Sequence, residues 1–169
     1  MAISILRLGH RTARDKRVST HCALVGRAFG AEKIYYTGDK DSELELSVRK
    51  IVESWGGPFT IEHIKGYASF IKNFKGETIH LTMYGLPYEE TIRKLSAKDK
   101  LIIVGGQKVP ADVYQIADYN IGVTNQPHSE IAALAVLLEN ISTKPKFKNA
   151  KQHISPKENG KEVKKNGCV

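Results

Sequence analysis

Residues 101–140, LIIVGGQKVPADVYQIADYNIGVTNQPHSEIAALAVLLEN, combine two short apolar runs with two polar turns. The first run, residues 101–104, ends at Gly105-Gly106, and the second, residues 119–123, leads into a polar turn before an apolar helix. Glycines directly after a strand let a ligand approach the backbone, and the first residues of a helix present free N–H groups. Either turn alone is common in α/β proteins. Together they predict a ligand site built from two neighbouring strand–helix turns.

The rest of the chain alternates between strand-like and helix-like segments. Ser19 or Thr20 is expected to cap the first helix, and Ser42 with Glu45 forms a capping-box pattern at the second. The alternation predicts an α/β fold with a mostly parallel sheet flanked by helices on both faces. Short apolar runs predict further strands at residues 3–8, 33–36, 59–64 and 78–84. Helical spacing, caps or an initial proline predict helices at residues 19–30, 42–55, 68–74, 87–97, 110–117 and 130–141.

Four stretches resemble the motifs of a known family. They are LRLGHRTARDKRVSTH at residues 6–21, LTMYG at 81–85, IVGGQKVP at 103–110 and VTNQPHSEIAALAVLLE at 123–139. Together they resemble the archaeal tRNA (cytidine-56) 2'-O-methyltransferases of the SPOUT superfamily. The resemblance covers residues 1–142 as one SPOUT methyltransferase domain. It implies a C-terminal trefoil knot, S-adenosylmethionine as cofactor, tRNA as substrate and a homodimer. Residues 143–169 lie outside it, break any periodicity, and are expected to form a basic, flexible tail.

The resemblance implies that three late turns hold the cofactor. In the family, backbone groups of these turns contact the adenine, and apolar side chains enclose its ring. Lys108 and Glu130 would use their side chains or are surface charges; His128 and Ser129 are ligand contacts or helix-capping groups. The matching positions are Leu81, Thr82, Met83, Gly85, Gly105, Gly106, Gln107, Lys108, Val109, Val123, Thr124, Asn125, Gln126, Pro127, His128, Ser129 and Glu130.

The arginine-rich loop after the first strand is the candidate catalytic region, with Arg14, Asp15 and Arg17 as catalytic residues. Ribose methylation needs the 2'-oxygen, the methyl carbon and the sulfur in line, and alignment alone is worth roughly 7 to 11 kcal/mol. The superfamily resemblance implies that an arginine here acts as the base or anchors the target phosphate. A guanidinium with a pKa of about 12.5 or above stays protonated, which favours anchoring. Arg14 is the first candidate and Arg17 the second. Asp15 either orients one of them by paired hydrogen bonds or neutralises an exposed loop.

The positive charge is concentrated in two segments. The chain of 169 residues has a net charge of +8. Residues 7–17 carry five basic side chains against one acidic, or +4, and residues 143–169 carry eight lysines against two glutamates, or +6. The remainder has 13 basic against 15 acidic residues, or −2. This distribution favours a polyanionic partner, and Arg7, Arg11 and Lys16 are assigned to RNA contacts. For the tail, a solvated lysine-rich terminus is the alternative.

Several classes of site and location are disfavoured. No apolar run approaches the roughly 20 residues that span a bilayer, and the N-terminus lacks a signal-peptide core, which predicts a cytoplasmic protein. Two scattered cysteines and six scattered histidines have no metal-ligand spacing. The turn after the first strand lacks the glycine pattern of Rossmann enzymes. The alternatives to ribose methylation are a SPOUT enzyme acting on a base or on rRNA, and a non-catalytic RNA-binding module.

Overall fold

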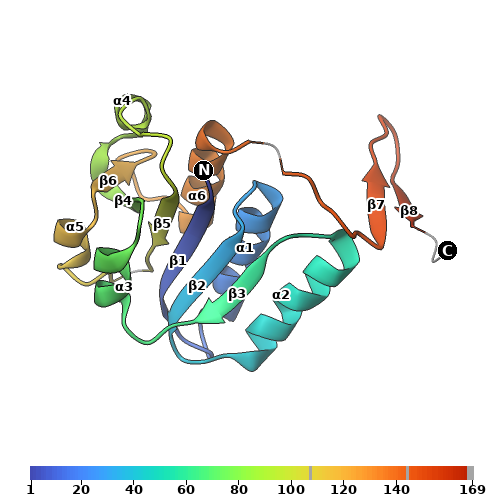
Figure 1. The fold of residues 1–169 in the computed structure, drawn as a ribbon, viewed down its shortest axis with the longest axis horizontal. Helices are drawn as coiled ribbons and strands as arrows, with labels where there is room; N and C mark the ends of the chain where they lie inside the picture. Colours follow the sequence, from blue (N-terminus) through green and yellow to red (C-terminus); the bar gives the residue numbers. More distant parts are fainter. Residues whose placement is uncertain (107, 144, 167–169) are drawn as a thin grey trace.

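The computed structural model describes residues 1–106, 108–143 and 145–166. Its centre is a six-stranded sheet in the order β3-β2-β1-β5-β4-β6, in which every neighbouring pair is parallel (Figure 1). The predicted α/β class with a mostly parallel sheet is therefore confirmed. The strands are β1 (Ile3–His10), β2 (Lys33–Gly38), β3 (Thr60–His63), β4 (Glu77–Pro87), β5 (Lys100–Val104) and β6 (Tyr119–Gly122).

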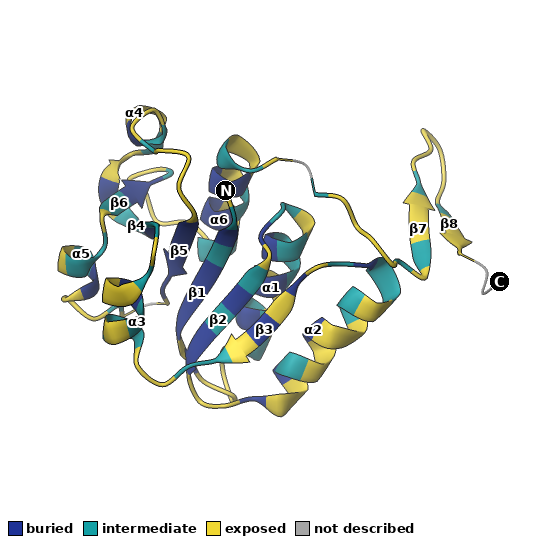
Figure 2. Cartoon of the chain, in the orientation of Figure 1, coloured by how far each residue is buried: buried dark blue, intermediate teal, exposed yellow. Residues whose placement is uncertain are grey.

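Helices cover both faces of this sheet. Alternate residues of a strand point to opposite faces, so Ile3 and Ile5 of β1 belong to one apolar cluster and Leu6 and Leu8 to the other. The central strands β1 and β5 are dark blue, that is buried, along most of their length (Figure 2). The first cluster includes residues of α1 (Lys16–Ala28), α2 (Ser42–Trp55), α4 (Tyr88–Ile92) and α6 (Glu130–Ile141). The second includes residues of α3 (Tyr67–Asn73) and α5 (Val113–Ile116).

Several helix boundaries differ from the sequence-based expectation, and three of them bear on the site. Helix α1 begins at Lys16 and not at the predicted Ser19 or Thr20, which places Lys16 and Arg17 on the helix. Helix α2 is capped by Asp41, whose side chain accepts from two backbone N–H groups at 2.9 and 3.0 Å, and not by Ser42.

The helix predicted at residues 87–97 is limited to α4, Tyr88–Ile92. Strand β4 continues to Pro87, three residues beyond its predicted end. On the other side, the Glu77 carboxylate accepts the Ser96 N–H at 3.2 Å and draws the chain back towards β5. The helix is short because β4 extends to Pro87 before it and Ser96 is bound to β4 after it.

Strand β4 loops out where it meets β6. Ile121 pairs with both Leu81 and Leu86, so residues 82–85 bulge between the two pairings. The amide of Asn125 donates to the carbonyls of Met83 and Gly85 at 2.7 and 3.0 Å. A Cβ atom at Gly85 would lie 2.5 Å from the Ile121 carbonyl carbon, so the two backbones can approach this closely only at a glycine. The segment after β6 is thus held tightly against this bulge.

The C-terminal segment contains regular structure. Strands β7 (Gln152–Ser155) and β8 (Glu162–Lys165) form an antiparallel hairpin that projects beyond α2 (Figure 1). Residues before the hairpin are tied to the body, because Lys148 bridges to Gly57 and the Arg27 guanidinium lies 4.5 Å from the Phe147 ring centre. The sequence analysis predicted no strands in this segment, because the hairpin has few apolar residues to reveal it. Its flexibility and the boundary at residue 142 stay predictions.

In the described ranges, none of the helices combines the length and apolar character that a membrane crossing requires.

Candidate active site

Two cavities adjoin at the carboxyl edge of the sheet. In parallel α/β sheets, ligands bind outside the carboxyl ends of the strands where the strand order reverses. Here β1 has β2 on one side and β5 on the other. One cavity lies beyond β4, β5 and β6, the other lies beyond β1, and Gly106 lines both.

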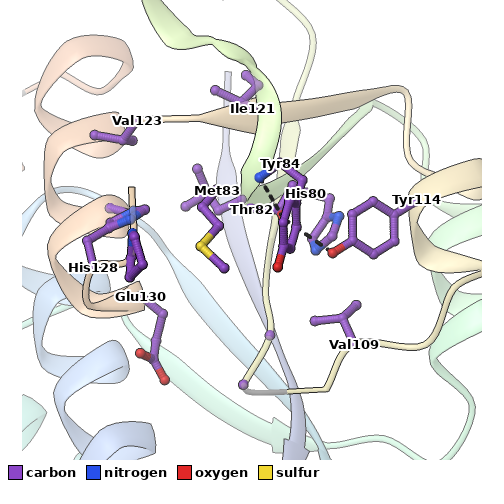
Figure 3. Close-up of a pocket in the computed structure, with 15 residues that line it drawn as sticks. His80, Thr82, Met83, Tyr84, Val109, Tyr114, Ile121, Val123, His128 and Glu130 are labelled. Atoms are coloured by element: carbon purple, nitrogen blue, oxygen red, sulfur yellow. Dashed lines mark hydrogen bonds between the residues drawn. The ribbon is translucent and has the colours of Figure 1, made fainter. Parts of the chain in front are cut away.

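The first cavity has a volume of about 350 Å³ and a mixed polar and apolar wall. This lies within the range of roughly 300 to 1,000 Å³ typical of small-molecule sites. Met83 points into it, and Glu130 enters from the start of α6 (Figure 3). The lining residues are His80, Leu81, Thr82, Met83, Tyr84, Gly105, Gly106, Val109, Tyr114, Ile121, Val123, Pro127, His128, Glu130 and Ala133.

The structure brings together residues from all three predicted cofactor turns, but not every residue. Gly85 packs against β6, and the Asn125 amide donates a hydrogen bond to the bulge of β4. Ser129 caps α6 by accepting a hydrogen bond from the Ile131 N–H at 3.2 Å. Thr124 and Gln126 are exposed outside the cavity wall, and Lys108 lines the second cavity. Gln107 lies outside the described residues. In the polar turn after β6, some residues therefore line the cavity and others stabilise the local backbone.

His80 is a cavity residue that the sequence did not reveal. Its side chain is fully buried on β4. The Asn120 amide donates to the Tyr114 carbonyl at 2.8 Å, so the Asn120 oxygen faces His80 Nδ1, also at 2.8 Å. That oxygen can only accept, so Nδ1 carries the proton and Nε2 has the lone pair. Burial lowers the pKa of His80, which keeps the ring neutral. Nε2 has no hydrogen-bond partner in the described structure.

Tyr114, Ile121 and Ala133 were also missed as lining residues. They come from α5, β6 and α6, and no local motif marks them. Only the packing of these elements places them around one cavity.

The second cavity has a volume of about 510 Å³ and is strongly basic. Four of its side chains are cationic and one is a carboxylate. It is lined by Arg7, Leu8, Gly9, Arg11, Arg14, Asp15, Gly106 and Lys108. Of the three predicted catalytic residues, Arg14 and Asp15 are brought here, whereas Arg17 lies on the exposed surface of α1 outside the cavity wall.

Asp15 is paired with Arg11, which the sequence analysis had not named as its partner. Arg11 Nε donates to one carboxylate oxygen at 2.9 Å, and Arg11 NH2 donates to the other at 3.4 Å. The Arg11 backbone N–H donates to the same carboxylate at 3.2 Å. The hydrogen bond from Arg11 lowers the pKa of Asp15, and the hydrogen bond to Asp15 raises the pKa of Arg11. The pair fixes the loop and keeps both groups charged.

Two of the expected RNA contacts are engaged within the protein. Arg7 is only 2% exposed, so it presents almost no surface to RNA; NH1 donates to the Leu8 carbonyl at 3.1 Å and NH2 lies 3.9 Å from Glu130. Any contact of Arg7 with RNA is thus limited to the second cavity, which Arg7 lines. Lys16 forms an ion pair with Glu43, although its side chain stays 44% exposed. Arg11 is exposed and lines the second cavity.

A buried histidine, His10, connects the segments on either side of the arginine-rich loop. His10 is fully buried, with Nδ1 2.8 Å from the Ser19 hydroxyl and Nε2 3.3 Å from the Asp41 carboxylate. Burial opposes ionisation of Asp41, but hydrogen bonds from Leu44, His10 and Glu43 outweigh it and lower the pKa of Asp41. These contacts join β1 to the starts of α1 and α2, and so fix both ends of the loop at residues 11–15.

Known proteins are similar to this chain in sequence or in fold. Residues 55–164 match the model of the family described as tRNA ribose 2'-O-methyltransferase, aTrm56. The tRNA (cytidine(56)-2'-O)-methyltransferase of Pyrococcus horikoshii is 49% identical over 170 residues, which cover 95% of this chain and 84% of that protein. The enzyme of the same name from Thermococcus kodakarensis is 48% identical over 172 residues, covering 95% and 96%. The chain belongs to the tRNA ribose 2'-O-methyltransferase family.

Membership of the tRNA ribose 2'-O-methyltransferase family confirms the sequence-based resemblance and extends it to residue 164, which includes all but the last residue of the hairpin. A solved structure supports the fold. The SpoU methyltransferase AviRb from Streptomyces viridochromogenes, in complex with AdoMet, superposes with a TM-score of 0.58 at 13% identity. The match covers 82% of this chain and 56% of that one.

The first cavity fits the methyl donor that this methyltransferase family implies. The apolar side chains of Leu81, Val109 and Ile121 suit the flat faces of an adenine ring, and Glu130 suits a cationic group. A Cβ atom at Gly105 would lie 2.0 Å from a methyl group of Val109, so the glycine keeps the wall thin. Over the described ranges, no group of three or more His, Cys, Asp or Glu side chains is arranged to hold a metal ion.

Proposed function

We propose that this chain transfers a methyl group from S-adenosylmethionine to the 2'-hydroxyl of cytidine 56 in tRNA. Two relatives that are close to half identical over nearly the whole chain bear the name of this activity. The observation that carries the proposal is the junction of the two cavities at Gly106. A small-molecule cavity and an anion-binding cavity share one wall, so a donor and a nucleotide bound in them would meet.

The first cavity would hold S-adenosylmethionine. When bound, this cofactor supplies an electrophilic methyl group on a sulfonium, whose departure as a thioether needs no metal. Leu81, Val109 and Ile121 would enclose the adenine, while the turns at Gly105-Gly106 and residues 123–128 offer backbone groups. A bound donor would fill much of this cavity. Its volume of about 350 Å³ leaves little room for solvent beside a bound nucleoside.

The second cavity would hold the target nucleotide. Arg11, Arg14 and Lys108 surround it with positive charge, which matches a phosphate. The Asp15 carboxylate accepts two hydrogen bonds from the Arg11 guanidinium, which is therefore oriented before RNA binds. Anchoring the phosphate places the adjacent ribose hydroxyl at the shared wall, and correct alignment contributes a large part of the rate.

We also infer a trefoil knot. Residues 82–85 bulge between two pairings of Ile121, and Asn125 binds carbonyls on this bulge after β6 has passed it. This is the local geometry expected where the C-terminal segment threads a loop.

We infer a homodimer from the apolar surface next to this bulge. Tyr84 and Leu86 are large hydrophobic residues near the C-terminal end of β4, yet they are 75% and 63% exposed. Adjacent exposed apolar side chains favour association with a second protein surface. Because tRNA is the proposed substrate, we also infer a cytoplasmic site of action.

Nucleoside analysis tests the activity directly. tRNA lacking modifications would be incubated with the protein and S-adenosylmethionine, digested to nucleosides and analysed by mass spectrometry. We expect 2'-O-methylcytidine, and its loss when cytidine 56 is replaced by uridine. A methylated base would show that the chain is a different SPOUT enzyme. RNA binding without turnover would support the non-catalytic module.

A further inference from the structure

The carboxylate of Glu130 lies at the boundary between the two cavities. It is the first residue of α6 and lines the first cavity (Figure 3). Its side chain is 36% exposed, so it can contact a bound molecule. Its ion-pair partner is Arg7, which lines the second cavity. Glu130 thus faces the donor from the side on which the acceptor would bind.

The ion pair between Arg7 and Glu130 includes no hydrogen bond. Arg7 NH2 lies 3.9 Å from Oε1, which is longer than a hydrogen bond. Arg7 is itself held by the carbonyl of Leu8 at 3.1 Å, which restricts how far it can approach. Arg7 is the only ion-pair partner of Glu130 within the described ranges. The other oxygen of the carboxylate can therefore serve a ligand.

The reacting end of the methyl donor must lie near this carboxylate. The methyl group has to leave one cavity and reach an oxygen in the other, so the sulfur must lie close to the shared wall at Gly106. Glu130 belongs to the first cavity and its partner to the second, which places the carboxylate at this same wall. The adenine would then occupy the apolar end near Leu81 and Ile121.

We infer that Glu130 makes the donor cavity selective for the positively charged S-adenosylmethionine over its neutral-sulfur product, S-adenosylhomocysteine. This inference rests on the proposed function. During transfer, the ribose oxygen forms a bond to the methyl carbon, the carbon–sulfur electron pair stays on sulfur, and the hydroxyl proton passes to solvent. The sulfur changes from a cation to a neutral thioether. Attraction to the carboxylate is lost at that moment, which favours release of the product.

Other charges near the boundary do not reproduce this selectivity; the carboxylate of Asp15, in the second cavity, is paired with Arg11 through both of its oxygens. Lys108 and Arg7 are cations on the side of the second cavity and would repel a sulfonium. His128 lines the first cavity, with Nδ1 2.7 Å from the Gln126 carbonyl to which it donates, so that this nitrogen offers no lone pair to a ligand. Within the described lining of the first cavity, Glu130 is the only acidic side chain. Its removal should abolish the preference.

Calorimetry with three ligands tests the inference. The variant Glu130→Gln keeps the size of the side chain and removes its charge. We expect it to bind S-adenosylmethionine about five- to tenfold more weakly, as befits one ion pair in a partly exposed site. The same loss is expected for sinefungin, which carries a protonated amine near the position of the sulfonium. Affinity for S-adenosylhomocysteine should change by less than about twofold, because its sulfur bears no charge.

Two controls separate the possible outcomes. Glu139→Gln, at the exposed opposite end of α6, should leave all three affinities unchanged. The melting temperature of Glu130→Gln shows whether the fold is retained. Equal weakening of all three ligands would overturn the inference and place Glu130 at the amino acid end of the donor. Unchanged binding of all three would overturn it as well. If the wild-type protein bound none of them, the proposed function itself would fail.

Discussion

Arg14 and Arg17 are three positions apart, yet only Arg14 lines the second cavity. We expect Arg14→Gln to lower methyl transfer by at least about 100-fold, which corresponds to roughly 2.7 kcal/mol of barrier. Loss of a positioned guanidinium misaligns the acceptor, whereas the donor cavity does not include Arg14. Affinity for S-adenosylmethionine should therefore change by less than about twofold. Single-turnover kinetics and calorimetry measure the two effects.

Arg17→Gln is the matched control. It should retain transfer within about threefold, because Arg17 lies outside the cavity wall. Equal losses in both variants would mean that the arginines act through general RNA affinity. A weakened donor site in Arg14→Gln would show that the loop has been placed wrongly.

His80 should make the stability of the protein sensitive to mild acid. Burial lowers the pKa of His80 below its ordinary value of about 6.5. The unfolded chain then binds the proton more readily than the folded one. The resulting stability is complete above about pH 6.5 and is lost as the pH falls towards the lowered pKa. His80→Asn can keep the hydrogen bond to Asn120 but cannot titrate, so its melting temperature should fall less between pH 7 and 5. Exposed His21→Gln serves as the control; an unchanged slope in His80→Asn would contradict this account.

Some of these site residues could be recognised from the sequence and others could not. The arginine loop was recognisable because Arg11, Arg14 and Asp15 lie within five positions. The pairing of Asp15 with Arg11 was not predictable, since it requires the loop to bring the backbone and side chain of Arg11 to one carboxylate. His80 is a single histidine within an apolar strand, a pattern that usually indicates a core residue. Only the neighbouring Asn120, 40 positions away, gives it a defined tautomer.

At the scale of elements, the bulge of β4 couples the fold to the donor site. Gly85→Ala should destabilise the protein by about 1–3 kcal/mol, because the added Cβ would lie 2.5 Å from the Ile121 carbonyl carbon, and backbone atoms cannot rotate away. The same shift would move Thr82 and Met83, which line the first cavity. We therefore expect both a lower melting temperature and weaker binding of S-adenosylmethionine.

Gly66→Ala is the control for this variant. Its Cβ would lie 3.0 Å from a serine hydroxyl, a flexible group that can rotate. Thermal denaturation should show only a small shift. If Gly85→Ala melted like the wild type, the close contact between β4 and β6 would not be essential to the fold.

Long periodic elements were predicted well and short ones less so. Helix α6 was predicted at residues 130–141, as observed, because its apolar sequence is continuous and Ser129 can cap it. The prediction for helix α4 was too long. The hydrogen bond from the Ser96 N–H to the Glu77 carboxylate, which limits the helix, joins residues 19 positions apart. The hairpin of β7 and β8 was missed because Ile154 and Val163 are its only large apolar pair and both are exposed. Tertiary contacts, not local pattern, decide such cases.

For the whole molecule, the uneven charge predicts how tRNA is held. The hairpin segment at residues 151–165 carries five lysines against two glutamates and projects away from the sheet (Figure 1). A basic arm outside the active site would contact phosphates of the tRNA body without affecting the chemistry at the ribose. Each phosphate contact releases counterions, so binding weakens as salt rises.

Substitution of Lys161, Lys164 and Lys165 by glutamine tests this without disturbing the contacts of Phe147 and Lys148 with the body. The slope of log Kd against log salt should decrease by up to about 3, roughly 1 per lost contact. Turnover at saturating tRNA should stay near that of the wild type. A control with Lys50, Lys72 and Lys98 changed to glutamine removes the same charge from other elements, and it should reduce the slope less. Equal slopes in the two triple variants would mean that tRNA senses only the net charge of the protein. If the hairpin variant kept both the wild-type slope and the wild-type affinity at low salt, the hairpin would have no role in RNA binding.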